Sequence, residues 1–210
     1  MENTATVKSK KARKIATTHF IAHVGMLGAI AAILMFFEIP LPFIAPAFYK
    51  MDFSEVPVLI GTFALGPIGG FFIEVIKILV HLAIKGTSTA FIGELGNLVV
   101  GAALFLPAGI LYKIKKTRKC ALIGMIVGTV CMVLVGSFFN AYVLLPLYAK
   151  AFGGMEAIIA AGTAVHASVT SVAGFVGLCV APFNLVKGII TSIITCILYK
   201  RVSIVIKRRL

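Results

Sequence analysis

The chain has 210 residues, a formal net charge of +13, and a composition that is 60% hydrophobic and 13% charged. Its mean hydropathy of +1.07 excludes a soluble globular domain, because water-compatible groups could not cover so much apolar surface. The basic residues flank apolar runs, which indicates attraction to anionic lipid and argues against nucleic-acid binding.

Three short blocks hold 15 of the 20 lysine and arginine residues. The blocks fall at positions 8–14, 113–119 and 200–209. Membrane proteins keep such blocks on the cytoplasmic side, so the number of spans between any two of them is expected to be even.

The first half of the chain contains three apolar runs, and a helical span needs roughly 20 residues. The first predicted span is 18–37, which lacks the cleavage site of a signal peptide. Two prolines after Glu38 end it, and 41–52 is expected to be a loop with some extended structure. The apolar run 55–65 is short, and a Gly-Pro turn joins it to a helix over 68–84. These two elements predict a helical hairpin.

In the second half, residues 91–112 form the fourth predicted span and 121–147 the fifth, which Pro146 is expected to end. The last span is predicted over 182–199. The segment 155–181 is apolar enough to cross, but a seventh crossing would place the last basic block outside. We therefore interpret 155–181 as an outer loop that is partly helical and whose end extends the last span.

The sequence thus predicts an all-α integral membrane protein. It is expected to be a six-transmembrane-helix bundle over 18–199, between basic cytoplasmic tails at 1–17 and 200–210. Both termini are therefore predicted to be cytoplasmic.

Two pairs of small residues lie in the first predicted span, Gly25/Ala29 and Gly28/Ala32. Small residues four positions apart let helices approach closely. The pairs therefore predict packing within the bundle or docking of a partner membrane protein.

Two lysines lie inside predicted spans, where a charge costs about 2.5–3.5 kcal/mol. Lys77 follows Glu74 by three residues and Lys187 follows Asn184 by three, so each pair shares a helix face. The Glu74/Lys77 pair is interpreted as an internal ion pair or as a functional pair. The Asn184/Lys187 pair lies next to Pro182, and distorted helices are typical of binding sites in membranes.

Other polar residues lie near the predicted outer ends of spans. Asn140 offers a donor and an acceptor, either for the imide or amide edge of a ligand or for an interhelical hydrogen bond. Glu94 and Asn97 are interpreted as capping and packing residues. Nearby aromatic residues are candidates for stacking on a flat ring; they are Phe43, Phe138, Phe139, Tyr142 and Phe183.

Catalytic and nucleotide-binding motifs are absent from the sequence. There is no G-x-x-x-x-G-K-[ST], so ATP binding through a P-loop is not expected. There is no H-E-x-x-H, no G-x-S-x-G and no paired carboxylate arrangement within the spans, which predicts that the protein is not an enzyme. His19 and His23 have a metal-capable spacing without a nearby acid or cysteine, and no metal or other cofactor is expected. The four cysteines are expected to be free thiols.

Several motifs resemble one family of membrane proteins. The runs Met51-Asp-Phe-Ser-Glu-Val-Pro, Glu74-Val-Ile-Lys and Gly86-Thr-Ser-Thr-Ala-Phe-Ile-Gly-Glu resemble the integral-membrane S components of energy-coupling factor (ECF) transporters. The runs Phe139-Asn-Ala-Tyr and Pro182-Phe-Asn-Leu-Val-Lys resemble the riboflavin-specific branch. The segment 155–181 departs from the family in being longer and more apolar.

The resemblance implies a vitamin pocket that opens outward, in the plasma membrane of a prokaryote. It implies that Asn140, Asn184 and Lys187 bind riboflavin, the transported substrate, at its polar edge and ribityl chain. Lys77 and Glu38 match polar positions near such a pocket. The predicted substrate-binding set is therefore Asn140, Asn184, Lys187, Lys77, Glu38 and Phe43.

The resemblance also implies partners that supply energy. A transmembrane T subunit and two cytoplasmic ATPases would drive the protein to turn its pocket inward, and the small-residue face of the first span would dock on them. Alternative interpretations are an S component for another vitamin, a solitary gradient-driven secondary transporter that couples through Glu74 and Lys77, and a membrane enzyme or assembly factor.

Overall fold

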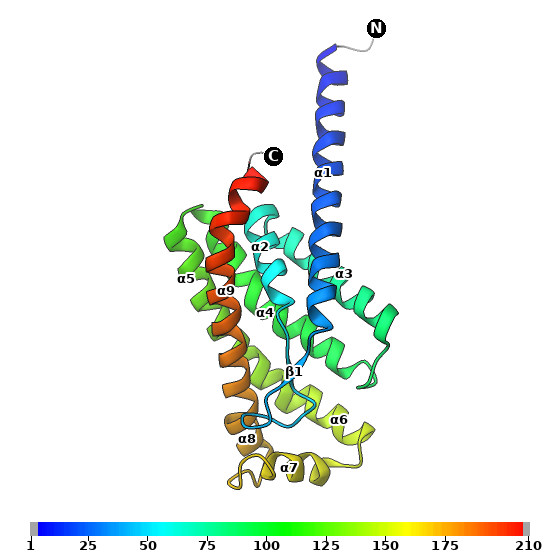
Figure 1. Ribbon diagram of the computed structural model, residues 1–210, viewed down its shortest axis with the longest axis vertical. Coiled ribbons are helices and arrows are strands. Elements are labelled where there is room, and N and C mark those ends of the chain that lie inside the picture. Colours follow the sequence, from blue (N-terminus) through cyan, green and yellow to red (C-terminus); the bar gives the residue numbers. More distant parts are fainter. Residues whose placement is uncertain (1–3, 208–210) are drawn as a thin grey trace.

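The computed structural model describes residues 4–207, with side chains described over 17–199. Within that range the regular secondary structure is helical apart from a small antiparallel hairpin, β1 (Ile39–Pro40) paired with β2 (Lys50–Met51) (Figure 1). The prediction of an all-α fold is confirmed, as is the prediction of extended structure in the loop after the first span.

The first half of the chain follows the predicted elements closely. Helix α1 (Thr4–Met35) contains the first span, α2 (Glu55–Leu65) is the short apolar helix, and α3 (Pro67–Lys85) follows it. Gly66, at φ +89°, makes the turn between α2 and α3, because glycine adopts this left-handed backbone without steric cost. The predicted helical hairpin is confirmed.

The fifth predicted span is longer than expected. After α4 (Ile92–Ile114), α5 (Arg118–Phe139) continues through a π-helical turn, η1 (Asn140–Leu144), into α6 (Leu145–Ala151). The prediction that Pro146 ends this helix is wrong. Pro146 lies at the start of α6, just after the π turn, where a proline does not interrupt the helix.

The last span also begins earlier than predicted. Helix α7 (Met155–Thr163) is followed by α8 (Val172–Phe175), a second π-helical turn η2 (Val176–Val180) and α9 (Ala181–Lys207). Pro182 therefore lies inside a continuous helical stretch rather than at its start. The interpretation of 155–181 as partly helical, with an end that extends the last helix, is confirmed.

Five helical stretches of the described chain are long and apolar enough to cross a bilayer. They cover 17–35, 67–85, 92–114, 118–151 and 172–199. Helix α2 has 11 residues and is about 17 Å long at 1.5 Å per residue, which is less than the roughly 30 Å of the hydrocarbon core. The structure therefore shows five candidate spans and one short buried helix, where six spans are predicted.

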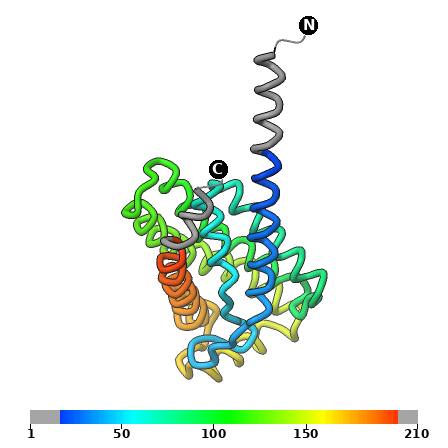
Figure 2. Tube along the Cα trace, turned by 45° about the horizontal axis from the view of Figure 1, so that its top comes forward, coloured from blue at the N-terminus to red at the C-terminus, as the bar shows by residue number. Residues whose placement is uncertain are grey.

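Both ends of the described chain lie at the same end of the bundle (Figures 1 and 2). The beginning of α1, the turn between α4 and α5, and the end of α9 are all at this end, where α1 projects beyond the other helices. The three basic blocks belong to these parts of the sequence. The β hairpin, α7 and α8 lie at the opposite end. The predicted tails continue α1 back to Thr4 and α9 to Lys207, and positions 1–3 and 208–210 lie outside the described residues.

Two apolar cores hold the bundle together. One joins α1 to α5 and includes Leu59, Ile73 and Phe105. The other lies at the hairpin end and includes Met51 and Phe175. Buried charged residues, among them Asp52 and Glu55, lie at the start of α2, and Asp52 belongs to the site described next.

Candidate functional site

A cavity of about 690 Å³ opens at the hairpin end of the bundle. This volume lies within the usual 300–1,000 Å³ of a small-molecule site. Its walls come from the segment between α1 and α2, the end of α3, the first part of α4, the η1–α6 region, α7, and the start of α9. The segment 155–181, predicted as an outer loop, therefore contributes α7 to the wall.

Four of the six predicted site residues line this cavity: Asn140, Asn184, Lys187 and Glu38. Asn140, Asn184 and Lys187 are buried, each with 5% or less of its surface exposed. Lys77 and Phe43 do not line it. Lys77 is fully buried within the bundle, and Phe43 is 70% exposed.

The two asparagines meet at Gly136, one helical turn before Asn140 on α5. The Asn140 side-chain amide donates to the Gly136 carbonyl at 2.7 Å. A Cβ atom placed on Gly136 would lie 2.6 Å from Asn184 Nδ2, so only glycine leaves room for that amide. Asn184 Nδ2 is buried and has no hydrogen-bond partner among the described residues. A buried donor without a partner costs free energy, which a carbonyl or hydroxyl oxygen of a ligand would recover.

Both asparagines lie close to π-helical turns. Asn140 is the first residue of η1, and Asn184 follows η2 by four positions. Such turns are frequent at functional sites. The sequence pattern indicates only the prolines that follow them, Pro146 and Pro182, because the turns themselves depend on packing between the two helices.

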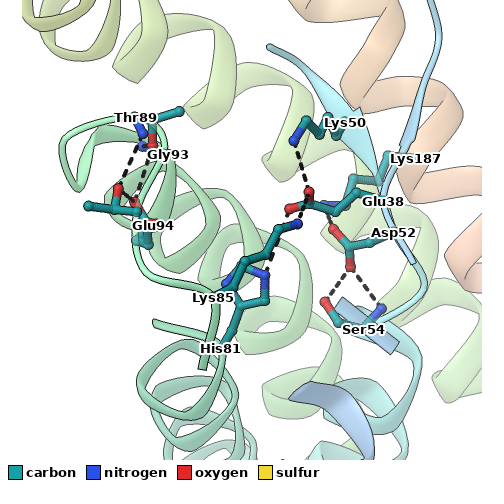
Figure 3. Close-up of polar contacts among 11 residues, drawn as sticks. Glu38, Lys50, Asp52, Ser54, His81, Lys85, Thr89, Gly93, Glu94 and Lys187 are labelled. Carbon is teal, nitrogen blue, oxygen red and sulfur yellow. Dashed lines mark hydrogen bonds and ion pairs between the residues drawn. The ribbon is translucent and has the colours of Figure 1, made fainter. Parts of the chain in front are cut away.

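The Lys187 ammonium pairs with Asp52, just before α2, at a distance of 3.1 Å (Figure 3). Both residues are buried. The backbone N–H of Ser54 donates to Asp52 Oδ1 at 2.8 Å, and the Ser54 hydroxyl donates to the same oxygen. Burial raises the pKa of Asp52, but the charges of Lys187 and Lys77 and the Ser54 hydrogen bonds outweigh it and lower the pKa to about 2. Asp52 therefore stays ionised and fixes Lys187 at the cavity wall.

A second ionic cluster lies at the cavity mouth, around Glu38. Its carboxylate accepts from Lys50 at 2.9 Å and from Lys85 at 2.6 Å (Figure 3). His81 Nε2 lies 3.9 Å from the other Glu38 oxygen. Partial burial raises the pKa of Glu38, but hydrogen bonds from Lys85 and Lys50 bring it below the usual range. The cluster joins the end of α1, the β hairpin and the end of α3.

Tyr49 covers Asn140 from the hairpin side. Its hydroxyl donates to Asn140 Oδ1 at 2.5 Å, and its ring packs against Phe175 and Phe183. Burial raises the pKa of Tyr49 well above its usual value, so the hydroxyl stays protonated and acts as the donor. Phe48 packs beside it.

The aromatic residues that the sequence singled out are mostly not the ones at the cavity. Of that set, Phe183 lines the cavity, whereas Phe43, Phe138 and Tyr142 are each more than 65% exposed. Helical periodicity turns Phe138 and Tyr142 away from the bundle. The sequence does not indicate the cavity aromatics Phe48 and Tyr49, because the conformation of an irregular segment cannot be deduced from its pattern. Tyr148 also lines the cavity, from helix α6, beyond the proline that is predicted to end the fifth span.

Glu94 and Asn97 also line the cavity. Glu94 accepts hydrogen bonds from the hydroxyls of Thr87 and Thr89 at 3.1 and 3.2 Å. These contacts order the loop before α4, which supports the predicted packing role of Glu94. The backbone N–H of Gly93 is capped by the Thr89 hydroxyl rather than by Glu94, and the place of Glu94 at the cavity is an addition.

Lys77 is part of a buried ionic group. Its ammonium lies 2.6 Å from Glu74 and 2.7 Å from Glu55, and all three side chains are at most 1% exposed. The interpretation of Glu74 and Lys77 as an internal ion pair is confirmed, with Glu55 as a third member. The oxygens of both carboxylates lie within about 3 Å of where a Cβ on Gly101 would stand, so α4 approaches closely only because of that glycine.

Asp52, Lys50 and Lys85 are further cavity residues that the sequence reasoning missed. Asp52 carried a usable signal, since it lies between Met51 and Phe53 in a largely apolar segment and precedes a helix. Lys50 and Lys85 carried none, because lysines at the ends of spans are common.

Comparison with known proteins identifies the family. The family described as ECF transporter, substrate-specific component, matches residues 19–199. The chain is 36% identical to riboflavin transporter RibU of Staphylococcus aureus over 88% of this chain and 90% of that protein. It is 29% identical to riboflavin transporter FmnP of Bacillus subtilis, over 84% of this chain and 87% of that protein.

A solved structure described as the S component of a bacterial ECF transporter superimposes with a TM-score of 0.71. It shares 32% identity and covers 91% of this chain and 99% of its own. With a cavity of amide, ammonium and aromatic groups at one end of an apolar helical bundle, this chain belongs to the family of substrate-specific S components of ECF transporters.

Proposed function

We propose that this chain binds riboflavin in the cavity at the hairpin end and delivers it across the cell membrane as the S component of an ECF importer. Two relatives that match most of the chain are named as riboflavin transporters. Riboflavin has a flat ring, an imide edge with alternating donors and acceptors, and a hydroxylated tail. Amides suit the edge, an ammonium suits carbonyl or hydroxyl oxygens, and aromatic walls suit the ring.

The unpaired Asn184 amide carries the proposal. It is buried, it has no partner among the described residues, and it lies at Gly136 beside Asn140. The two amides together offer the donors and acceptors that an imide edge requires. Lys187 and Glu38 are proposed as further contacts to the ligand. Lys77 is proposed to support the site indirectly, since its charge acts on Asp52 together with the charge of Lys187.

The proposed topology has six crossings, with both termini in the cytoplasm. Asp52 and Ser54 are buried and lead directly into α2, so an extended piece together with this short helix would make the second crossing. The basic blocks favour a cytoplasmic location for the end of the bundle that carries the termini. The cavity would then open to the outside of the cell, within a membrane domain over 18–199.

The proposed partners are a transmembrane T subunit and two cytoplasmic ATPases. Helix α1 offers one free small-residue face for docking. Gly28 packs against Ile76 of α3, whereas a Cβ on Gly25 would meet nothing within 4 Å, and Ala29 is exposed. The Gly25/Ala29 face is therefore the proposed contact with the T subunit.

Uptake of labelled riboflavin by liposomes tests this function. Liposomes that contain this chain, the T subunit and the ATPases should accumulate riboflavin only when ATP is enclosed with the ATPases. Liposomes with this chain alone should bind riboflavin without accumulating it. Accumulation by this chain alone under a proton or sodium gradient would instead support a secondary transporter.

A further inference from the structure

A second hollow lies between α5 and α9, on a face of the bundle separate from the cavity. This groove has a volume of about 590 Å³, and Thr129 and Ser192 are the two hydroxyl residues that line it. The Thr129 hydroxyl donates to the Met125 carbonyl at 2.8 Å and lies 3.4 Å from the Ser192 hydroxyl. The polar groups of the floor are therefore already engaged, and the groove suits an apolar chain rather than a polar metabolite.

The walls of the groove are two apolar stripes that run along the helices. On α5 the stripe consists of Leu122, Ile126 and Val130, and on α9 it repeats at every fourth residue from Leu185 to Ile197. Residues four apart share one helix face. The α9 stripe is about 18 Å long at 1.5 Å per residue, close to the roughly 15 Å of one leaflet of the hydrocarbon core. The groove therefore has the length of a single acyl chain.

Positive charge lies at one end of the α5 stripe. Arg118 precedes Leu122 by four residues and continues the α5 stripe past the end of the groove, and Lys119 is next to it. Arg118 is exposed, and no carboxylate of the described residues pairs with it. Arg201 follows Ile197 at the same spacing in the sequence. Arginine binds phosphate through two parallel N–H donors.

We propose that this groove binds one acyl chain of an anionic phospholipid whose phosphate contacts Arg118. The charge at one end, the apolar walls and the length of one leaflet fit this ligand, and basic sites between helices are known to recognise anionic headgroups. The lipid lies in the leaflet that faces the α4–α5 turn, which is the cytoplasmic leaflet in the proposed orientation. The site does not depend on riboflavin binding.

The absence of tryptophan from the chain makes an introduced tryptophan a single reporter. Leu122→Trp places it on the groove wall. Ile110→Trp is the matched control, because Leu122 and Ile110 each lie four residues from the α4–α5 turn and are similarly exposed, at 47% and 54%. Each riboflavin-free variant is reconstituted in phosphatidylcholine vesicles that contain increasing fractions of a brominated lipid. The brominated lipid is either phosphatidylglycerol or phosphatidylcholine, and in both cases the bromine atoms lie near the start of one acyl chain.

Brominated phosphatidylglycerol should reduce the tryptophan fluorescence of Leu122→Trp by half at about a fivefold lower mole fraction than brominated phosphatidylcholine does. The reason is that one basic residue near the membrane adds about 1 kcal/mol of attraction to an anionic lipid. The two lipids should quench Ile110→Trp alike. Adding Arg118→Gln to Leu122→Trp should remove the preference.

Two outcomes would overturn the proposal. One is equal quenching of Leu122→Trp by both lipids. The other is a preference for phosphatidylglycerol at Ile110→Trp as large as that at Leu122→Trp, which would indicate general attraction of anionic lipid to the basic turn. A preference that survives Arg118→Gln would overturn the assignment of the phosphate to Arg118. Circular dichroism and gel filtration of each variant show whether it is folded.

Discussion

The Lys187 ammonium on α9 lies 3.1 Å from the Asp52 carboxylate, although 135 positions separate them in the sequence. This contact ties the segment before α2 to the last long helix at the cavity wall. Ser54 holds the carboxylate in place from the other side. Asp52 thus positions the cation that we propose to contact the ligand.

Replacing Asp52 tests this role. Asp52→Asn keeps the shape of the side chain but removes the charge that holds Lys187. The dissociation constant for riboflavin should rise at least about tenfold, because a hydrogen bond to a charged group contributes about 1.5–3 kcal/mol. Quenching of flavin fluorescence measures the constant. Glu156→Gln, an acid-to-amide change at an exposed position of α7, is the control and should bind as the unchanged protein does.

The pH dependence of stability tests the ionised state of Asp52. Its pKa falls from 3.8 to about 2 on folding, so the stabilisation is fully present above pH 3.8 and is lost as the pH falls toward 2. The midpoint of thermal unfolding should be higher for the unchanged protein than for Asp52→Asn above pH 3.8. This difference should shrink below it, and a difference that stays constant down to pH 2 would contradict the account.

Replacing Gly136 tests whether the position of the Asn184 amide beside Asn140 matters for binding. Gly136→Ala would place a methyl group 2.6 Å from Asn184 Nδ2 and displace that amide. Riboflavin affinity should fall about tenfold, the equivalent of one lost hydrogen bond of about 1.4 kcal/mol. Gly25→Ala, which meets nothing within 4 Å, controls for the change in helix propensity. Unchanged titration curves for Gly136→Ala would show that Asn184 is not part of the site.

Replacing Lys77 tests whether the buried ionic group stabilises the fold. Lys77→Met leaves Glu55 and Glu74 buried without their cation, and breaking a buried pair costs about 3–5 kcal/mol. The thermal midpoint in detergent should fall markedly, and a further Glu55→Gln change should recover part of the loss. Lys150→Met, at an exposed position, should leave the midpoint within error. If Lys77→Met behaves like Lys150→Met, the group does not stabilise the fold.

Replacing Glu38 tests whether the ionic cluster at the cavity mouth slows the release of the ligand. Glu38→Gln weakens the contacts that join the hairpin to α3 through Lys50 and Lys85. Dissociation of riboflavin should become about fivefold faster, which corresponds to about 1 kcal/mol for a hydrogen bond. Stopped-flow fluorescence measures the rate. An unchanged dissociation rate would mean that this ionic cluster does not hold the mouth closed.

Much of the fold could be predicted because hydrophobic runs and basic blocks are local signals. The hairpin of α2 and α3 follows from a Gly-Pro turn between two apolar runs. The path of the chain through Pro146 could not be predicted, since a π turn is set by contacts with a neighbouring helix. The second of the six crossings stays a prediction, because an 11-residue helix is too short to cross without the buried segment before it.

The cavity residues divide in the same way. Asn140, Asn184 and Lys187 carry a clear signal, since uncompensated polar groups in apolar runs are costly. Tyr49 and Asp52 lie in an irregular segment, whose path depends on contacts with α9 that are distant in sequence. Phe43 lies in that segment too, and its pattern could not show that the side chain faces away from the cavity.

The visible absorbance spectrum tests the central proposal most directly. The purified protein is equilibrated with riboflavin and then freed of unbound ligand by gel filtration. The account predicts a flavin absorbance band that elutes with the protein and is strongly reduced in the folded Asn184→Ala, Lys187→Ala double variant. A colourless protein after equilibration, or a double variant that retains the full band, would contradict it.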